Sequence, residues 1–141
     1  MTLFSLIKLI KDISLKQPNV RSFGEGNIYD FMNANPSIEY DVVFLTQGTH
    51  TQDETFDHYN FTIFYTSRLQ SDLEDNRLQI QSAGKEIISN IIRTLREAYD
   101  IDVEMISFTS WTQKFSDENA GVYAQLIMDI PIDFLCYEEY E

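Results

Sequence analysis

Two histidines and several carboxylates share one polar stretch of the sequence, and these residue types can bind metal ions or move protons. Three carboxylates lie between His50 and His58, namely Asp53, Glu54 and Asp57. The HExxH spacing of a helical zinc site is absent, and no Cys/His cluster replaces it. A strand that begins near Phe56 would also point Asp57 and His58 to opposite faces. The sequence therefore favours an exposed loop tip over a metal or catalytic site.

A second acidic pair, Asp117 and Glu118, lies in the stretch KFSDENAG. General acid/base catalysis would need a positioned partner for these carboxylates. No histidine, cysteine or glycine-rich cradle accompanies them in the sequence. Asp117, Asn119 and Gly121 are residue types that turns use, so we expect a hydrated turn between two strands.

The G-x-G at Gly24 and Gly26 is the remaining pattern that could bind a cofactor. It lacks the third glycine of a dinucleotide-binding fingerprint, and no strand is predicted before it. The sequence thus predicts no catalytic residue, no cofactor-binding residue and no metal ligand. We expect a protein that is not an enzyme.

The period of the hydrophobic residues predicts the elements that hold these side chains. Apolar residues at three- and four-residue spacing indicate an N-terminal helix, with Leu3, Leu6, Ile7, Ile10 and Ile13 on one face. Alternation with a period of two indicates strands. These strands cover residues 38–44, 59–66, 103–108 and 122–130.

A long helix of about 25 residues is predicted between the two pairs of strands, roughly 38 Å at 1.5 Å per residue. Ser71 and Glu74 form a capping box at its start. Its apolar stripe includes Ile88 and Ile91, which we expect to be buried. Gly84 falls on the same stripe, where a missing side chain would let the helix approach a sheet closely.

The predicted fold is α+β, with a four-stranded, largely antiparallel sheet, helices packed on one face, and the order αββαββ. No internal repeat or linker divides the chain, so we expect a single domain over residues 1–141. The hydrophobic fraction, 43%, is sufficient for a core and argues against disorder.

The charge of the chain excludes several classes of protein. The sequence has 10 basic and 23 acidic side chains, for a formal net charge of −13. Neutralising phosphates needs lysine and arginine, so this balance argues against a protein that wraps nucleic acid or docks on an anionic membrane. The single cysteine, Cys136, excludes an intrachain disulfide and fits a reducing compartment.

The succession of elements in this acidic chain resembles the tail-terminator and head–tail connector proteins of tailed bacteriophages. The matching stretches are the N-terminal helix, PSIEYDVVF, a polar connection, LQSDLEDNRLQIQSAGKEIISNIIRTL and WTQKFSDENAGVYAQLIMDIPI. In the last stretch, Phe115, Asp117 and Gly121 resemble an aromatic, acidic and glycine pattern before the closing strand. The acidic aromatic segment after Pro131 departs from the family.

The resemblance implies a structural virion protein, a homo-oligomeric ring at the head–tail junction or tail end through which DNA passes without specific binding. Its partners would be neighbouring phage connector or tail proteins, without a membrane. It would reside in the virion and, during assembly, in the host cytoplasm. An acidic lumen would repel phosphate. Two alternatives are an acidic interaction module that mimics DNA and a small ligand-binding α+β domain.

Ring closure requires a heterologous contact between two different patches of the subunit. The polar connection over residues 46–58, called the arm below, is longer than a hairpin turn needs. Either an ordered hairpin or a mobile loop would fit its sequence. The candidate inter-subunit residues in the arm are Gln47, Thr49, His50, Gln52, Asp53, Glu54 and Phe56.

Overall fold

The protein is α+β, with two helices and six strands in the part of the chain that the structure describes. In this computed structural model, the described residues are 1–28, 39–69, 74–112 and 119–132. The helices are α1 (Leu3–Leu15) and α3 (Glu74–Tyr99). The strands are β1 (Ser22–Glu25), β2 (Val42–Gln47), β3 (Thr51–Gln52), β4 (Phe56–Arg68), β5 (Asp102–Thr112) and β6 (Asn119–Pro131).

The prediction of a four-stranded sheet in the order αββαββ is wrong. The order is αββββαββ, and the sheet is mixed because β1 runs parallel to β2. β1 contains only four residues, and its glycine-containing sequence resembles a turn. β3 contains two exposed polar residues. Both strands form through pairing with distant backbone, which the local hydrophobic period does not reveal.

The strand order across the sheet is β1-β2-β4-β6-β5, with β3 paired to β4 beside this path. The antiparallel pair β4 and β6 forms the centre, and its register runs unbroken from Phe56 opposite Pro131 to Arg68 opposite Asn119. β5 pairs with β6 along its length, with a bulge between Met105 and Ser107.

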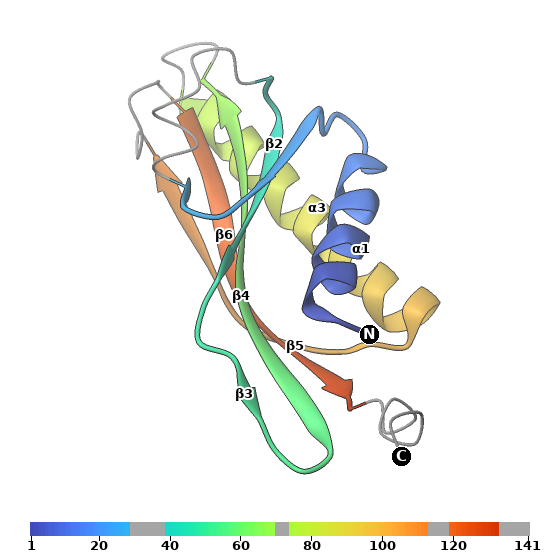
Figure 1. The fold of residues 1–141 in the computed structure, drawn as a ribbon. Coiled ribbons are helices and arrows are strands. Elements are labelled where there is room, and N and C mark those ends of the chain that lie inside the picture. Colours follow the sequence, from blue (N-terminus) through green and yellow to red (C-terminus); the bar gives the residue numbers. More distant parts are fainter. Residues whose placement is uncertain (29–38, 70–73, 113–118, 133–141) are drawn as a thin grey trace.

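Both helices cover one face of the sheet (Figure 1). Period-two alternation places the odd-numbered residues of β4 and the even-numbered residues of β6 on this face. The helices bury their apolar stripes against them, and Ile88 and Ile91 are fully buried as expected. The largest fully buried side chains of this core are Leu6, Ile10, Leu45, Ile63, Ile88, Ile91, Leu95, Leu126 and Met128.

Gly84 lets α3 approach the sheet closely. A Cβ at this position would lie 2.4 Å from Cδ1 of Tyr65 and 2.9 Å from Cγ2 of Val122. These distances are too short for any side chain, so the helix could not remain at its present height over β4 and β6. The expectation that this glycine permits close packing is confirmed.

The opposite face of the sheet carries a small second core around Phe44. Ile28 and Phe64 are buried with it, and Tyr40 and Tyr123 pack against them. Val42–Leu45 are consequently buried on both faces. The prediction of a strand over residues 38–44 with one buried face is wrong in extent, since β2 begins at Val42.

The central strands continue past the helix layer, and the β3–β4 hairpin extends from the body of the molecule (Figure 1). The two sides of the arm are therefore themselves strands, β3 on one side and the start of β4 on the other. Two other predicted features, the acidic pair Asp117 and Glu118 and the capping residue Ser71, lie outside the described residues. The turn between β5 and β6 lies outside them too.

Candidate functional site

The tip of the arm is a hydrogen-bonded turn built on Asp53. Its Oδ1 accepts the backbone N–H groups of Thr55 at 2.8 Å and Phe56 at 2.7 Å. Its own N–H donates to the carbonyl of Phe56 at 3.0 Å. Aspartate favours such turns because its short side chain reaches the backbone two residues ahead. The arm is thus an ordered hairpin, which decides between the two forms that its sequence allowed.

His58 is held between two carboxylates beside this turn. Its Nε2 lies 2.8 Å from Oδ2 of Asp53, and its Nδ1 lies 2.5 Å from Oδ1 of Asp129. The β4–β6 register places Asp129 directly opposite His58. Because ionised carboxylates only accept hydrogen bonds, this arrangement suits an imidazolium that donates from both nitrogens.

The electrostatics of the tip follow from these contacts. Hydrogen bonding to Asp129, and then to Asp53, raises the pKa of His58 above its ordinary value of 6.5. The backbone N–H of Phe56, and then the His58 ring, lower the pKa of Asp53 to about 2. The charged forms of His58 and Asp53 therefore stabilise each other.

His50 holds the base of the arm through a different set of bonds. Its Nδ1 accepts the backbone N–H of Asn60 at 3.0 Å, so in the neutral ring the proton lies on Nε2. That nitrogen lies 3.0 Å from Oε1 of Gln47 and donates to it. The ring also packs against Tyr59 and Phe61, with centroids at 5.3 and 5.5 Å.

Asn60 connects the two sides of the arm at the same level. Its Nδ2 donates to the carbonyl of Thr49 at 2.5 Å, and its own carbonyl accepts from the N–H of Gly48 at 2.8 Å. Gln47 further donates to Oε1 of Glu25 at 3.1 Å, which ties the arm to β1. The arm is therefore positioned by polar contacts and contributes little to the main core.

Asp57 and His58 point to opposite faces of β4, as expected for a strand that begins at Phe56. Asp57 accepts from Nε2 of Gln52 at 2.6 Å, whereas His58 contacts Asp53 and Asp129. His50 packs on the Tyr59 face, so the two histidines do not converge. Among the described residues, no group of three His, Cys, Asp or Glu side chains is arranged to hold a metal ion.

The chemistry available at His58 is limited by its bonds. Both ring nitrogens are engaged by carboxylates, so neither is left to take a proton from a nucleophile. The tip instead presents exposed side chains on an ordered turn. The residues from Thr51 to Phe56 are exposed, and the Phe56 side chain keeps 36% of its surface in contact with solvent.

The seven candidate residues thus differ in role. Gln47, Thr49 and His50 form the base of the arm, Gln52 braces β3, and Asp53 builds the turn. Glu54 and Phe56 are exposed at the tip without a side-chain hydrogen bond to another described residue, and the centroid of the Phe56 ring lies 6.4 Å from that of the His58 ring.

Sequence reasoning missed Asp129. Its position on the polar face of β6 was visible from the alternation, but its partner His58 lies 71 positions earlier in the chain. Only the β4–β6 register brings them together.

Asp41 was missed for a similar reason. Its carboxylate accepts from the hydroxyls of Tyr65, at 2.6 Å, and Ser67. Its carbonyl accepts the N–H groups of Arg21 and Ser22, which fixes β1 beside β2. Burial, and then the bond to Asp41, raises the pKa of Tyr65. Asp41 therefore has a structural role at the start of β2.

Two further findings bear on the site. No helix within the described ranges is long and apolar enough to cross a membrane. No protein-family model matches the chain, and no curated protein matches it in sequence.

Proposed function

We propose that this chain is a structural subunit that assembles into a ring, as the resemblance to tail-terminator and connector proteins of tailed bacteriophages implies. The ring would sit at a head–tail junction or tail end, contact neighbouring phage proteins, and let DNA pass through its centre. The proposal gives the chain no catalytic role and no cofactor.

The arm is the observation that carries this proposal. It extends past the helix layer (Figure 1), yet its turn is fixed by Asp53 and its base by His50 and Asn60. A connection that only reversed the chain would need two to five residues. An ordered, exposed extension that adds little to the core is suited to contacting another subunit, because little conformational entropy is lost on binding.

The ends of the sheet supply two different surfaces for a heterologous contact. β1 and β5 are the terminal strands of the main path, and each pairs with one neighbour among the described strands. A strand edge can extend the sheet of another molecule. The bulge in β5 between Met105 and Ser107 limits unspecific pairing at that edge, while Ile106 beside it is 54% exposed.

The net charge of −13 is compatible with a channel for DNA. A surface with excess carboxylates repels phosphate, so the nucleic acid would slide through without being held. Net charge alone also fits an acidic module that mimics DNA, which would bind a basic partner one to one instead of binding itself.

The test is the mass of the full chain by light scattering over a range of protein concentrations. We expect a closed oligomer for the wild type. Combining Glu54→Lys with Phe56→Ser should shift this equilibrium toward monomer, because both side chains are exposed and neither contributes to the hydrogen bonds of the tip. Circular dichroism should be unchanged in the variant.

The matched control is Leu78→Ser on α3, which removes another exposed apolar side chain, at 49% exposure, far from the arm along the chain. It should assemble as the wild type does. Identical rings from the double variant would show that the arm tip is not the contact. A wild type that stays monomeric at every concentration would contradict ring assembly itself and favour the acidic interaction module.

A further inference from the structure

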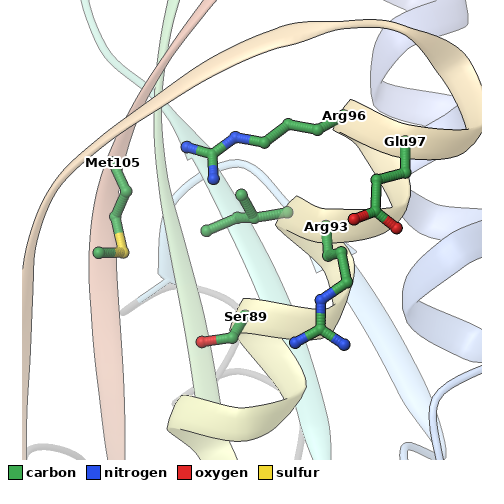
Figure 2. A pocket seen from close by; sticks show the side chains of 6 residues that line it. Ser89, Arg93, Arg96, Glu97 and Met105 are labelled. Carbon is green, nitrogen blue, oxygen red and sulfur yellow. The ribbon is translucent and has the colours of Figure 1, made fainter.

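A groove lies between the last turns of α3 and the start of β5 (Figure 2). It encloses about 450 Å³. Two arginines, Arg93 and Arg96, line it from the helix, and Met105 lines it from the strand. The remaining lining residues are Ser89, Ile92 and Glu97. The groove thus combines cationic groups with apolar surface.

The two arginines have no carboxylate partner among the described residues. The ion pairs found there both involve His58. Arg96 donates from Nε at 3.0 Å and Nη2 at 2.5 Å to the carbonyl of Val103, which leaves its other N–H groups available. Arg93 is exposed. The carboxylate of Glu97 lines the same groove, so the two guanidinium groups leave the groove with an excess of one positive charge, which favours an anionic ligand.

We propose that the acidic aromatic segment that follows β6, residues 133–141, binds in this groove of its own chain. The segment, DFLCYEEYE, contains four carboxylate side chains, Asp133, Glu138, Glu139 and Glu141. It also contains three aromatic rings, Phe134, Tyr137 and Tyr140. Guanidinium groups bind carboxylates bidentately and stack on aromatic faces. Met105 and Ile92 supply apolar contacts for a ring.

The register of the sheet places the end of β6, where this segment begins, within reach of the groove. Met105 pairs with Leu126, five residues before the end of β6 at Pro131, which is about 17 Å along a strand. The nine residues of the segment span about 30 Å when extended, so they reach the groove with residues to spare. A second cavity of about 270 Å³, lined in part by Tyr99, Ile101 and Pro131, lies on the way.

Binding within one chain is favoured over binding between chains. A tethered segment is present at an effective concentration in the millimolar range. Two separate copies would also have to overcome the repulsion between their net charges of −13. The groove would therefore be filled in an isolated subunit, and another molecule that binds there would have to displace the segment.

Cys136 makes this proposal testable in the full chain, because it is the only cysteine and lies within the segment. Met105→Cys places a second thiol in the groove, and Leu78→Cys places one on α3 near its opposite end as a control. Under a mild added oxidant, peptide mapping and non-reducing gels would report the disulfides. We expect an intrachain disulfide in Met105→Cys that forms at least about tenfold faster than in Leu78→Cys, since disulfides need Cα atoms within about 7 Å.

Ser89→Cys places a thiol at a second position in the groove, so the test does not depend on whether the protein folds with Met105→Cys. Equal rates at the groove and at the control position would overturn the proposal. Disulfides that form only between chains, at rates that rise with protein concentration, would overturn it too and would indicate binding between subunits.

A charge reversal tests the chemistry of recognition. Arg93→Glu, introduced into the Met105→Cys chain, should slow the intrachain disulfide about tenfold, because a charge-assisted bond becomes a repulsion. Lys85→Glu makes the same change in charge two turns earlier on α3 and should leave the rate unchanged. Equal slowing by both variants would show an effect of net charge alone and would contradict a specific site.

Discussion

His58 is the residue whose protonation is most directly linked to the geometry of the arm. Its pKa is raised by hydrogen bonds to Asp129 and Asp53. A group with a raised pKa in the folded state contributes stability that is fully present below its ordinary value, here 6.5, and is lost as pH rises through the folded value. The arm should therefore be held most firmly in mildly acidic solution and loosen as pH rises past the raised pKa of His58.

We predict that His58 titrates above 6.5 in the folded protein, as measured by NMR of its ring protons. Asp129→Asn should bring the pKa back toward the ordinary value, because the nearer carboxylate is replaced by a neutral amide. His58→Gln, which cannot titrate, should remove part of the pH dependence of the denaturation midpoint above pH 6.5. A wild-type His58 that titrates at or below its ordinary value would contradict this account.

Single residues also show what could be read from the sequence. Gly84 was identified from its place on an apolar stripe, because a helical period specifies which side chains meet the sheet. The partnership of His58 with Asp129 was not identified, because it depends on strand register. Register is set by the pairing of whole strands, and no feature near either residue reports it.

Long elements with strong periodicity were predicted from the sequence, and short ones were not. α3 and β6 have enough apolar residues at constant spacing to specify both their type and their buried face. β1 and β3 have four and two residues, and they exist because β2 and β4 offer them backbone partners. The prediction for β2 failed at its start because the ladder with β4 begins at Val42, and the carbonyl of Asp41 accepts the N–H groups of Arg21 and Ser22 instead.

The burial of α3 leads to a prediction about stability. Ile88 is fully buried between the helix and the sheet. Ile88→Ala should reduce the free energy of unfolding by about 2–5 kcal/mol, through lost burial and the cavity left behind. Chemical denaturation measures this value. Leu78→Ala on the same helix is the control, since Leu78 is 49% exposed and should change the free energy of unfolding little. Equal midpoints for Ile88→Ala and wild type would show that the helix does not pack on the sheet.

The arm shows why point changes at its tip are more informative than its removal. β4 is paired with β6 from Phe56 onward, and His50 and Asn60 join the two sides of the arm. Shortening the arm would break these bonds and disturb the sheet. Substituting Glu54 and Phe56 changes the exposed surface and leaves the hydrogen bonds of the tip in place.

At the scale of the whole molecule, the charge determines how the protein meets nucleic acid. The 23 acidic side chains outnumber the 10 basic side chains by 13. Binding to DNA depends on lysine and arginine replacing the counterions of the phosphates, and this contribution is largest at low salt. The groove with Arg93 and Arg96 is a cationic feature of the described surface, and its charge is small beside this excess of carboxylates.

We therefore predict that the full chain does not retard duplex DNA in a gel, even at low ionic strength, where electrostatic attraction is least screened. Arg93→Glu should behave identically, because no phosphate contact is lost. The segment that follows β6 gives a sharper comparison. In the proposed complex the carboxylates of this segment cover Arg93 and Arg96, so combining Glu138→Gln with Glu139→Gln would expose the two arginines. The remaining negative charge of the chain should still prevent a shift of the DNA band. Retardation by the wild-type chain alone would contradict the role of an acidic conduit, since a subunit that binds DNA would hold the molecule it is proposed to let pass.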